Sequence, residues 1–347
     1  MTLQFGDPAP NFVAAGISNP RYIFNTAAGR YLLLAIVPAG PAVDRAVASI
    51  ERRRPAFNDV HAGAFIVIVG KDDGRNTRRD GIPGLRFLFD EDGAVAALYD
   101  AVEAERWYLI DPALHVMAGV GSDKANSLVD RTATLPPPDR HGGTEATAPV
   151  LLTPRIFELA FCERLIALYR EIGGEASGFM REVDGVTTLM MDTQHKRRSD
   201  VIIEDLVVQQ QAVARLNRRL LPQIEKVFNF KATRIERYLV ARYDAETGGF
   251  FRPHRDNTTR GTAHRRFAVS INLNADYEGG DLRFPEFGPR TYRPPPGGAV
   301  VFSCSLLHEA TTVTRGERFA FLPFLYDEAA AHIREANLAF LDPALTA

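Results

Sequence analysis

Cysteine is scarce in this chain: its 347 residues include two, Cys162 and Cys304. Two cysteines cannot build the disulfide framework of a small secreted protein. The low count fits a reducing compartment, so we expect a cytoplasmic location. An excess of one charge is also missing, because 41 Lys and Arg residues stand against 43 Asp and Glu residues, a formal net charge of −2. This balance does not favour a nucleic acid or an anionic membrane as a partner.

Long hydrophobic runs are absent as well. No apolar run approaches the ~20 residues that a membrane-spanning helix needs. The longest candidate, Tyr31–Val37, stops at Pro38 and is predicted to be a buried strand. The first residues lack the basic and apolar regions of a signal peptide. A hydrophobic content of 46% and a charged content of 24% are ordinary for a globular protein.

A length of 347 residues suggests two domains. The best boundary is the segment 132–150, which is rich in Pro, Gly and Thr and has no apolar periodicity. This composition predicts a linker with a stiff polyproline centre. We therefore expect one domain over residues 1–131 and a second over residues 151–347.

Strand and helix patterns alternate before the linker. The predicted elements are strands at Tyr31–Val37, Ala64–Val69, Leu85–Phe89 and Arg106–Ile110, and helices at Val43–Arg53 and Ala94–Tyr99. Apolar strands that alternate with helices indicate a layered α/β domain. The motifs GDPAPNF (6–12), FLFDEDGAVAALYD (87–100) and RWYLIDPALHVM (106–117) resemble peroxiredoxins. The resemblance implies a thioredoxin-like fold for roughly residues 1–130.

A peroxiredoxin needs a reactive cysteine after its first core strand, because the thiolate attacks the peroxide. The corresponding loop, Val37–Arg45, contains no cysteine, and neither does the rest of residues 1–161. Peroxidase and thiol-exchange activities are therefore excluded. Packing, partner binding and dimerisation remain open, and we expect a homodimer formed through this domain.

The second domain contains a candidate iron site. Alternate residues of a strand share a face, so His254 and Asp256 can point into one pocket. His308 follows Asp256 by 52 residues, after the apolar run Gly298–Phe302. Two imidazoles and one carboxylate form the facial triad of non-haem Fe(II) oxygenases. An isolated His-x-Asp pair usually has no such meaning, but the surrounding strands and turns support this interpretation.

Residues from about Pro154 to Asp327 resemble the iron(II)/2-oxoglutarate-dependent dioxygenases, specifically their prolyl 4-hydroxylase-like branch. The resemblance rests on RYDAETGGFFRPHRDN, VSINLNADYEGGDLRFPEFG and PPPGGAVVFSCSLLHEATTVTRGERFAFLPFLY. It implies a double-stranded β-helix (jelly-roll) core with supporting helices. It implies that His254, Asp256 and His308 hold Fe(II), that 2-oxoglutarate is the cosubstrate and that ascorbate is a candidate further cofactor.

The same resemblance implies roles for two more residues. Arg318, ten residues after His308, would pair with the distal carboxylate of 2-oxoglutarate. Tyr243 would donate its hydroxyl to that carboxylate. Asn272 lies two residues after Ser270 on a strand expected to face inward, so it would touch either cosubstrate or substrate.

The implied reaction is hydroxylation of a C–H bond in a peptidyl or free amino acid, with release of succinate and CO2. Asp256 excludes the halogenase variant, in which a small residue leaves this position to chloride, so hydroxylation or a related desaturation or demethylation remains. Three alternatives stay open: a non-catalytic binding or scaffold module, an oxygenase acting on a small natural product, and a cupin-like dioxygenase that uses no 2-oxoglutarate. Arg318 argues against the last.

Helices are predicted at Phe161–Tyr169, with Cys162 on the packed side, and at Ile202–Phe228, with a solvated face of Arg215, Arg218 and Arg219. The basic segment that includes His195, Lys196, Arg197 and Arg198 is interpreted either as a mobile substrate lid or as an ordinary surface loop. His264 is expected to be a loop residue that does not bind the metal.

Overall fold

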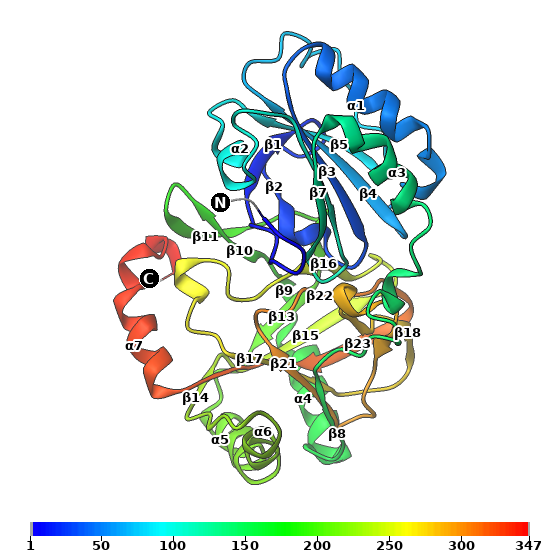
Figure 1. Ribbon diagram of the computed structural model, residues 1–347. Coiled ribbons are helices and arrows are strands. Elements are labelled where there is room, and N and C mark those ends of the chain that lie inside the picture. Colours follow the sequence, from blue (N-terminus) through cyan, green and yellow to red (C-terminus); the bar gives the residue numbers. More distant parts are fainter. Residues whose placement is uncertain (1–2, 346–347) are drawn as a thin grey trace. The chain divides into compact units, whose positions relative to one another are not determined.

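The computed structural model shown in Figure 1 describes residues 3–345. The chain divides into two compact units, Met1–Ala148 with Pro285–Pro289, and Pro149–Phe284 with Arg290–Ala347. Residues 133–148 lie in the first unit, and a separate linker over 132–150 stays a prediction. Among the described residues, no helix is both long enough and apolar enough to span a membrane.

The first unit has a thioredoxin-like fold. Its seven strands lie in the order β2-β1-β5-β4-β3-β6-β7. They are β1 (Val13–Gly16), β2 (Tyr22–Ile23), β3 (Tyr31–Pro38), β4 (Ala62–Val69), β5 (Leu85–Asp90), β6 (Arg106–Ile110) and β7 (Val116–Val120). Strand β3 pairs in parallel with β4 and antiparallel with β6, which pairs antiparallel with β7. The helices are α1 (Pro41–Glu51), α2 (Ala94–Leu98) and α3 (Ala125–Thr132).

Helices cover both faces of this sheet (Figure 1). Leu33 and Ala35 of β3 pack in one cluster with residues of α1 and α3. Leu32 and Leu34 pack in another with residues of α2. Burial on both faces requires apolar residues at every position, which explains why the strand is a continuous hydrophobic run. All four strands predicted here are confirmed, and the first predicted helix begins two residues earlier, at Pro41.

The second unit is a double-stranded β-helix made of two antiparallel sheets. The larger sheet follows the path β14-β24-β17-β23-β15-β13-β9, with β21, β8 and β18 attached. Its strands are β14 (Arg234–Glu236), β24 (Phe324–Tyr326), β17 (Phe267–Asn272), β23 (Val313–Phe321), β15 (Leu239–Asp244), β13 (Ser199–Ile202), β9 (Glu175–Ala176), β21 (Ala299–Ser303), β8 (Leu151–Thr153) and β18 (Tyr277–Gly279).

The smaller sheet has the order β12-β16-β22-β19-β20. These strands are β12 (Lys196–Arg197), β16 (Phe250–His254), β22 (His308–Ala310), β19 (Leu282–Arg283) and β20 (Thr291–Tyr292). A separate hairpin joins β10 (Phe179–Val183) to β11 (Val186–Met190). The helices are α4 (Leu159–Ile172), α5 (Leu206–Arg215), α6 (Leu221–Phe228) and α7 (Glu328–Ala336).

One face of the larger sheet is covered by helices. Val269 and Ile271 of β17, with Phe319 of β23, join a buried cluster that includes residues of α4, α5 and α6. Strand residues alternate between faces, so Ser270, Asn272 and Arg318 belong to the opposite face. This alternation assigns polar side chains to the interior of the β-helix. Cys162 of α4 is buried in the same apolar cluster, as predicted.

The helix predicted over Ile202–Phe228 is wrong at its start and in its middle. Ile202 ends β13, and α5 begins at Leu206 because the Asp205 carboxylate accepts hydrogen bonds from two backbone N–H groups of its first turn. A π-helical turn, Leu216–Leu220, then separates α5 from α6. On the predicted solvated arginine face, the partly exposed Arg215 and Arg219 both pair with Glu158 at the surface.

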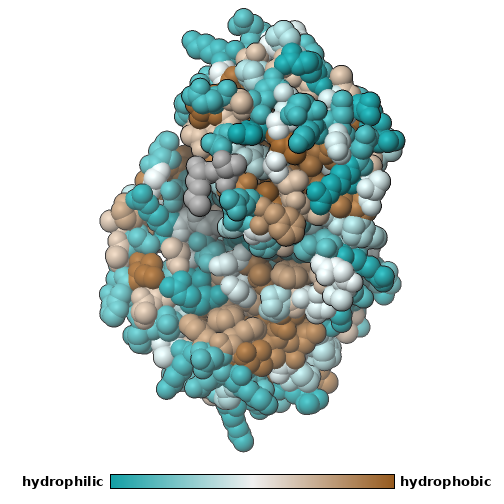
Figure 2. Space-filling view, in the orientation of Figure 1, coloured by the Kyte–Doolittle hydropathy of each residue, from teal (hydrophilic) through white to brown (hydrophobic). Residues whose placement is uncertain are grey.

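Hydrophilic residues predominate on the molecular face shown in Figure 2, where hydrophobic residues form separate patches.

Candidate metal centre

Two neighbouring strands and one turn bring His254, Asp256 and His308 together. β16 and β22 pair antiparallel, and His254 lies opposite His308. β16 ends at His254, so Asp256 lies beyond the strand, where its backbone N–H donates to the Cys304 carbonyl at 2.9 Å. The three side chains therefore converge as predicted. Asp256 reaches the site from a turn after β16, and not from the alternation of side chains along a strand.

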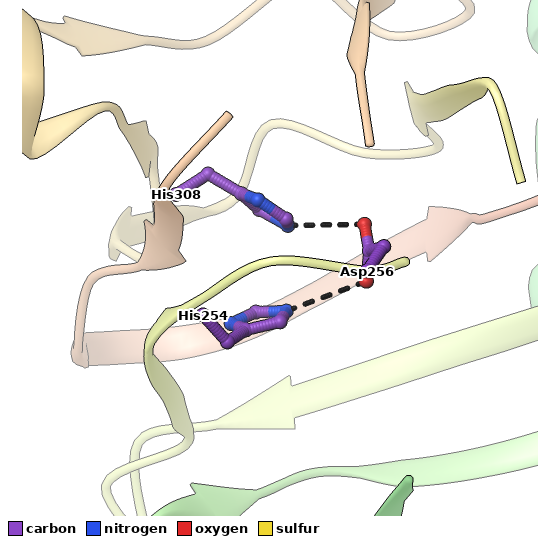
Figure 3. Close-up of side chains that lie close together, drawn as sticks. All are labelled: His254, Asp256 and His308. Atoms are coloured by element: carbon purple, nitrogen blue, oxygen red, sulfur yellow. Dashed lines mark ion pairs between the residues drawn. The ribbon is translucent and has the colours of Figure 1, made fainter. Parts of the chain in front are cut away.

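The three side chains converge on one point (Figure 3). Their ligand atoms all lie within 4.8 Å of one another. His254 Nε2 is 3.6 Å from one carboxylate oxygen of Asp256, and His308 Nε2 is 3.3 Å from the other. Two imidazole nitrogens and a carboxylate oxygen at this spacing fit one divalent transition metal and leave positions open for other ligands.

Backbone carbonyl groups set the orientation of both imidazole rings. The Nδ1 atom of His254 lies 2.7 Å from the Arg252 carbonyl oxygen, and that of His308 lies 3.0 Å from the Leu306 carbonyl oxygen. A carbonyl oxygen can only accept, so each Nδ1 carries the proton. Each Nε2 then has a free lone pair directed towards Asp256, which is the tautomer that a metal ligand needs.

The protonation states also suit metal binding. Burial, reinforced by repulsion from His308, lowers the pKa of His254 to about 4. Burial opposes ionisation of Asp256, but the neighbouring imidazoles of His308 and His254 hold the pKa of its carboxyl well below its usual range. At neutral pH, His254 is a neutral ligand and Asp256 an anionic one.

Aromatic side chains pack against the ligands. The Phe251 ring stacks on the His254 imidazole, with centroids 3.5 Å apart, and the Phe302 ring lies 4.5 Å from the His308 imidazole. These contacts restrict rotation of both ligands and shield one side of each ring from water.

Arg318 lies inside the β-helix on β23, opposite Tyr243 of β15, and is 3% exposed. Its Nη2 donates to the Ser270 hydroxyl at 2.8 Å, and its Nε donates to the Asn272 side-chain oxygen at 3.3 Å. Within residues 3–345, no carboxylate forms an ion pair with it. Because a buried guanidinium keeps its charge, this site suits an anionic ligand.

Asn272 holds this arrangement in place. Its amide nitrogen donates to the Tyr277 hydroxyl at 2.7 Å and to the Pro294 carbonyl at 3.0 Å, while its oxygen accepts from Arg318. The contact of Asn272 with a cosubstrate or substrate stays a prediction. Ser270 was not assigned a role from the sequence, although its place two residues before Asn272 on one strand was the available signal.

Tyr243 is buried beside the same guanidinium, whose central carbon lies 5.4 Å from the ring centroid. The Tyr243 hydroxyl accepts a long hydrogen bond, 3.5 Å, from Arg198. Its donation to 2-oxoglutarate stays a prediction.

The basic segment around Lys196 is not an exposed loop. Lys196 and Arg197 form β12, which pairs with β16, and Ser199 begins β13. The Lys196 side chain is buried because it packs against the Phe251 ring, 4.8 Å from its centroid. His264, expected not to be a ligand, contacts the Glu236 carboxylate at 2.7 Å and lies outside the triad.

Comparison with known proteins bears directly on this site. Residues 238–326 match the family model described as the 2OG-Fe(II) oxygenase superfamily, and this range contains all three triad residues and Arg318. The chain contains a 2OG-Fe(II) oxygenase domain. Its family and its facial triad imply Fe(II) and 2-oxoglutarate as cofactor and cosubstrate.

The chain is 29% identical over 143 residues to a PKHD-type hydroxylase from Nitrobacter winogradskyi, covering 38% of this chain and 63% of that protein. It thus spans less than two thirds of the length of that curated relative.

Two solved structures are similar in part. A prolyl-4-hydroxylase from Pseudomonas putida has 18% identity and a TM-score of 0.41, with coverage of 52% of this chain and 94% of that one. The thioredoxin domain of a thiol-disulfide oxidoreductase from Bacteroides vulgatus also has 18% identity, with a TM-score of 0.32 and coverage of 38% and 100%.

Proposed function

We propose that this protein is an Fe(II)- and 2-oxoglutarate-dependent oxygenase that hydroxylates a C–H bond of a peptidyl or free amino acid. It would belong to the prolyl 4-hydroxylase-like branch and release succinate and CO2. The observation that carries the proposal is the triad of His254, Asp256 and His308 in one β-helix, together with a buried Arg318 that forms no ion pair with any carboxylate of residues 3–345. The similarity to a PKHD-type hydroxylase supports the reaction class.

Each residue has a distinct role in this proposal. The triad would hold Fe(II), and Arg318 would hold the distal carboxylate of 2-oxoglutarate with help from Tyr243 and Asn272. Bound Fe(II) and 2-oxoglutarate supply the oxidising chemistry. The protein positions both groups and shields the ligands with apolar rings. Ascorbate is included as a candidate further cofactor.

For the first unit we propose a peroxiredoxin-like origin without thiol chemistry. The loop after β3 contains no cysteine, so it cannot attack a peroxide. Homodimer formation through this unit is the role we propose for it, and a cytoplasmic location is proposed from the low cysteine count.

An anaerobic titration with Fe(II) and 2-oxoglutarate tests the enzyme assignment. A weak visible charge-transfer band is expected when a keto acid binds iron through two oxygen atoms. Admission of O2 should then give succinate. Absence of the band and of succinate would contradict the proposal. Proline peptides and free amino acids, screened in parallel for extra succinate, would identify the substrate class.

A further inference from the structure

Positive charge is unusually concentrated inside the oxygenase domain. Besides Arg318, two basic side chains of the 196–198 segment are buried, with Lys196 6% exposed and the Arg198 side chain 4% exposed. Arg237, just before β15, has a fully buried Nε. Buried charges normally require partners of opposite sign, so these cations need an explanation.

Arg198 and Lys196 share one carboxylate. Arg198 Nη2 lies 2.6 Å from an Asp200 oxygen, and the Ser177 hydroxyl donates to the same oxygen at 2.5 Å. Lys196 Nζ donates to the Ser177 hydroxyl at 2.7 Å and to the Gly178 carbonyl at 2.5 Å, and it forms no ion pair of its own with a described carboxylate. One negative charge therefore serves two cations.

Arg237 has less compensation. Its guanidinium carbon lies 4.3 Å from the Phe324 centroid, and its buried Nε has no hydrogen-bond partner among residues 3–345. The neighbouring carboxylate of Glu236 is already engaged by Arg265 at 2.6 Å and by His264. Arg237 also has a φ of +54°, a left-handed conformation that costs energy for a residue with a side chain. Among the described residues, the fold thus holds Arg237 in place without an ion pair.

Side-chain contacts place these cations beside the metal centre. Lys196 packs against the Phe251 ring, which stacks on the His254 imidazole. Arg237 and Arg265 both lie over the Phe324 ring, and Arg265 Nη1 donates to the Asp256 carbonyl oxygen at 3.4 Å. Burial is the main cause that lowers the pKa of Lys196 well below its usual value and that of Arg237 to about 10. An anion bound between them would offset both desolvation penalties.

Binding of Fe(II) and 2-oxoglutarate would leave the excess positive charge of Lys196, Arg198 and Arg237 unchanged. In the proposed complex, the two charges of Fe(II) and the one of Arg318 match the carboxylate of Asp256 and the two carboxylates of 2-oxoglutarate. Arg265 is matched by Glu236. When Lys196 is protonated, Lys196, Arg198 and Arg237 carry three positive charges against the one negative charge of Asp200, so two positive charges remain.

We propose that Lys196, Arg198 and Arg237 form a subsite for a carboxylate of the substrate, beside the metal centre and distinct from the place of 2-oxoglutarate at Arg318. This proposal rests on the proposed function and narrows it to substrates that carry an acidic group near the oxidised C–H bond. Arg198 and Asp200 position the subsite, while Lys196 and Arg237 supply the unmatched charge.

The test compares acids with their neutral counterparts. One probe pair is N-acetyl-L-proline and N-acetyl-L-prolinamide, and a second is a blocked prolyl-glutamate dipeptide and its glutamine analogue. The first pair tests a free carboxylate and the second an acidic side chain. Succinate formation above the level without a probe is measured at saturating 2-oxoglutarate. At least one acid should half-saturate the wild-type protein at a concentration tenfold or more below that of its amide.

Arg237→Met should raise the half-saturating concentration of that acid by roughly 30-fold, as expected for loss of one desolvated charge pair, and leave the amide curve in place. Lys196→Met should do the same and serves if Arg237→Met does not fold. Arg234→Met is the matched control, because Arg234 is exposed and pairs with Glu328 at 2.9 Å. It should keep the preference for the acid.

If acid and amide have equal half-saturating concentrations in both probe pairs, the proposed subsite is refuted. It is also refuted if folded Arg237→Met and Lys196→Met keep the wild-type preference for the acid. If these variants instead weaken 2-oxoglutarate binding and leave the half-saturating concentration of the acid unchanged, the cations bind the cosubstrate, and the proposed subsite is likewise refuted. The iron–2-oxoglutarate band of the wild-type protein is read separately. Its absence refutes the proposed function, whereas its presence with no acid preference refutes only the subsite.

Discussion

Replacement of Arg318 by methionine should separate binding of 2-oxoglutarate from binding of iron. Methionine fills much of the arginine volume, so the change removes charge and hydrogen bonds without a large cavity. The guanidinium is 3% exposed and bonds to neutral partners alone, Ser270 and Asn272, among the described residues. We therefore expect the ligand-free variant to be as stable as the wild-type protein or more stable, because an uncompensated buried charge has been removed.

The cost should appear when 2-oxoglutarate is added. Loss of one partner of a desolvated charge-assisted pair is worth about 2–5 kcal/mol. At about 1.4 kcal/mol per tenfold change, the lower limit corresponds to a roughly 30-fold weaker affinity. The stabilisation that saturating 2-oxoglutarate confers should fall by about 2 kcal/mol. For a domain of about 150–250 residues this is a loss of roughly 4–8 °C in the thermal shift.

The assay is anaerobic titration of the Fe(II)-loaded protein with 2-oxoglutarate, followed by the visible band and by thermal melting. Arg315→Met is the matched control, since Arg315 lies on the same strand but is exposed and pairs with Glu278 at 2.9 Å. Iron affinity should be similar in all three proteins. If Arg318→Met binds 2-oxoglutarate as tightly as Arg315→Met does, the assignment of the buried guanidinium to the cosubstrate is refuted.

Three further outcomes are expected. His254→Ala should abolish succinate formation and weaken Fe(II) binding while circular dichroism stays native; full Fe(II)-dependent turnover would remove this residue from the triad. Hydrogen bonds from Arg219 and Arg215 lower the pKa of Glu158 from 4.5 to about 2, so its contribution to stability is present above pH 4.5 and lost as pH falls towards 2. Because this side chain is 47% exposed, Glu158→Gln should lower the free energy of unfolding by about 1 kcal/mol or less at pH 7. In urea titrations, the free energy of unfolding of the variant should depend less on pH between 4.5 and 2 than that of the wild-type protein. An unchanged pH dependence would contradict the pairing. Gly297→Ala should lower the melting temperature with a loss of more than about 1 kcal/mol, because φ is +74° and the added Cβ would lie 2.1 Å from the Phe157 carbonyl oxygen; an equal melting temperature would show that the turn adapts.

The sequence alone was sufficient for the layered fold of the first unit and for the chemistry of the metal centre. Continuous apolar runs such as Tyr31–Val37 predict strands buried on both faces, because a buried polar side chain costs free energy unless it finds a hydrogen-bond partner. The residue types of the triad limited the candidate metals and reactions through the chemistry of imidazole and carboxylate ligands. The missing cysteine after β3 excluded thiol chemistry without any structure.

Local sequence patterns predicted the wrong secondary structure where contacts between distant residues determine it. The apolar residues from Ile202 to Phe228 fit a helix by periodicity, yet Ile202 lies in a strand that pairs with β15. Asp256 was placed by strand alternation, but the hydrogen bond to Cys304 holds it in a turn. Pairing partners that are distant in the sequence decided both cases, and a single sequence does not reveal them.

The burial of charge was decided by tertiary structure alone. A run of basic residues at 195–198 reads as a solvated surface, because charged side chains usually stay in water. Pairing of β12 with β16 and of β13 with β15 instead places Lys196 and Arg198 inside the domain. Sequence thus determined which groups can bind iron and an acid, while long-range strand pairing determined which charges are desolvated and share one site.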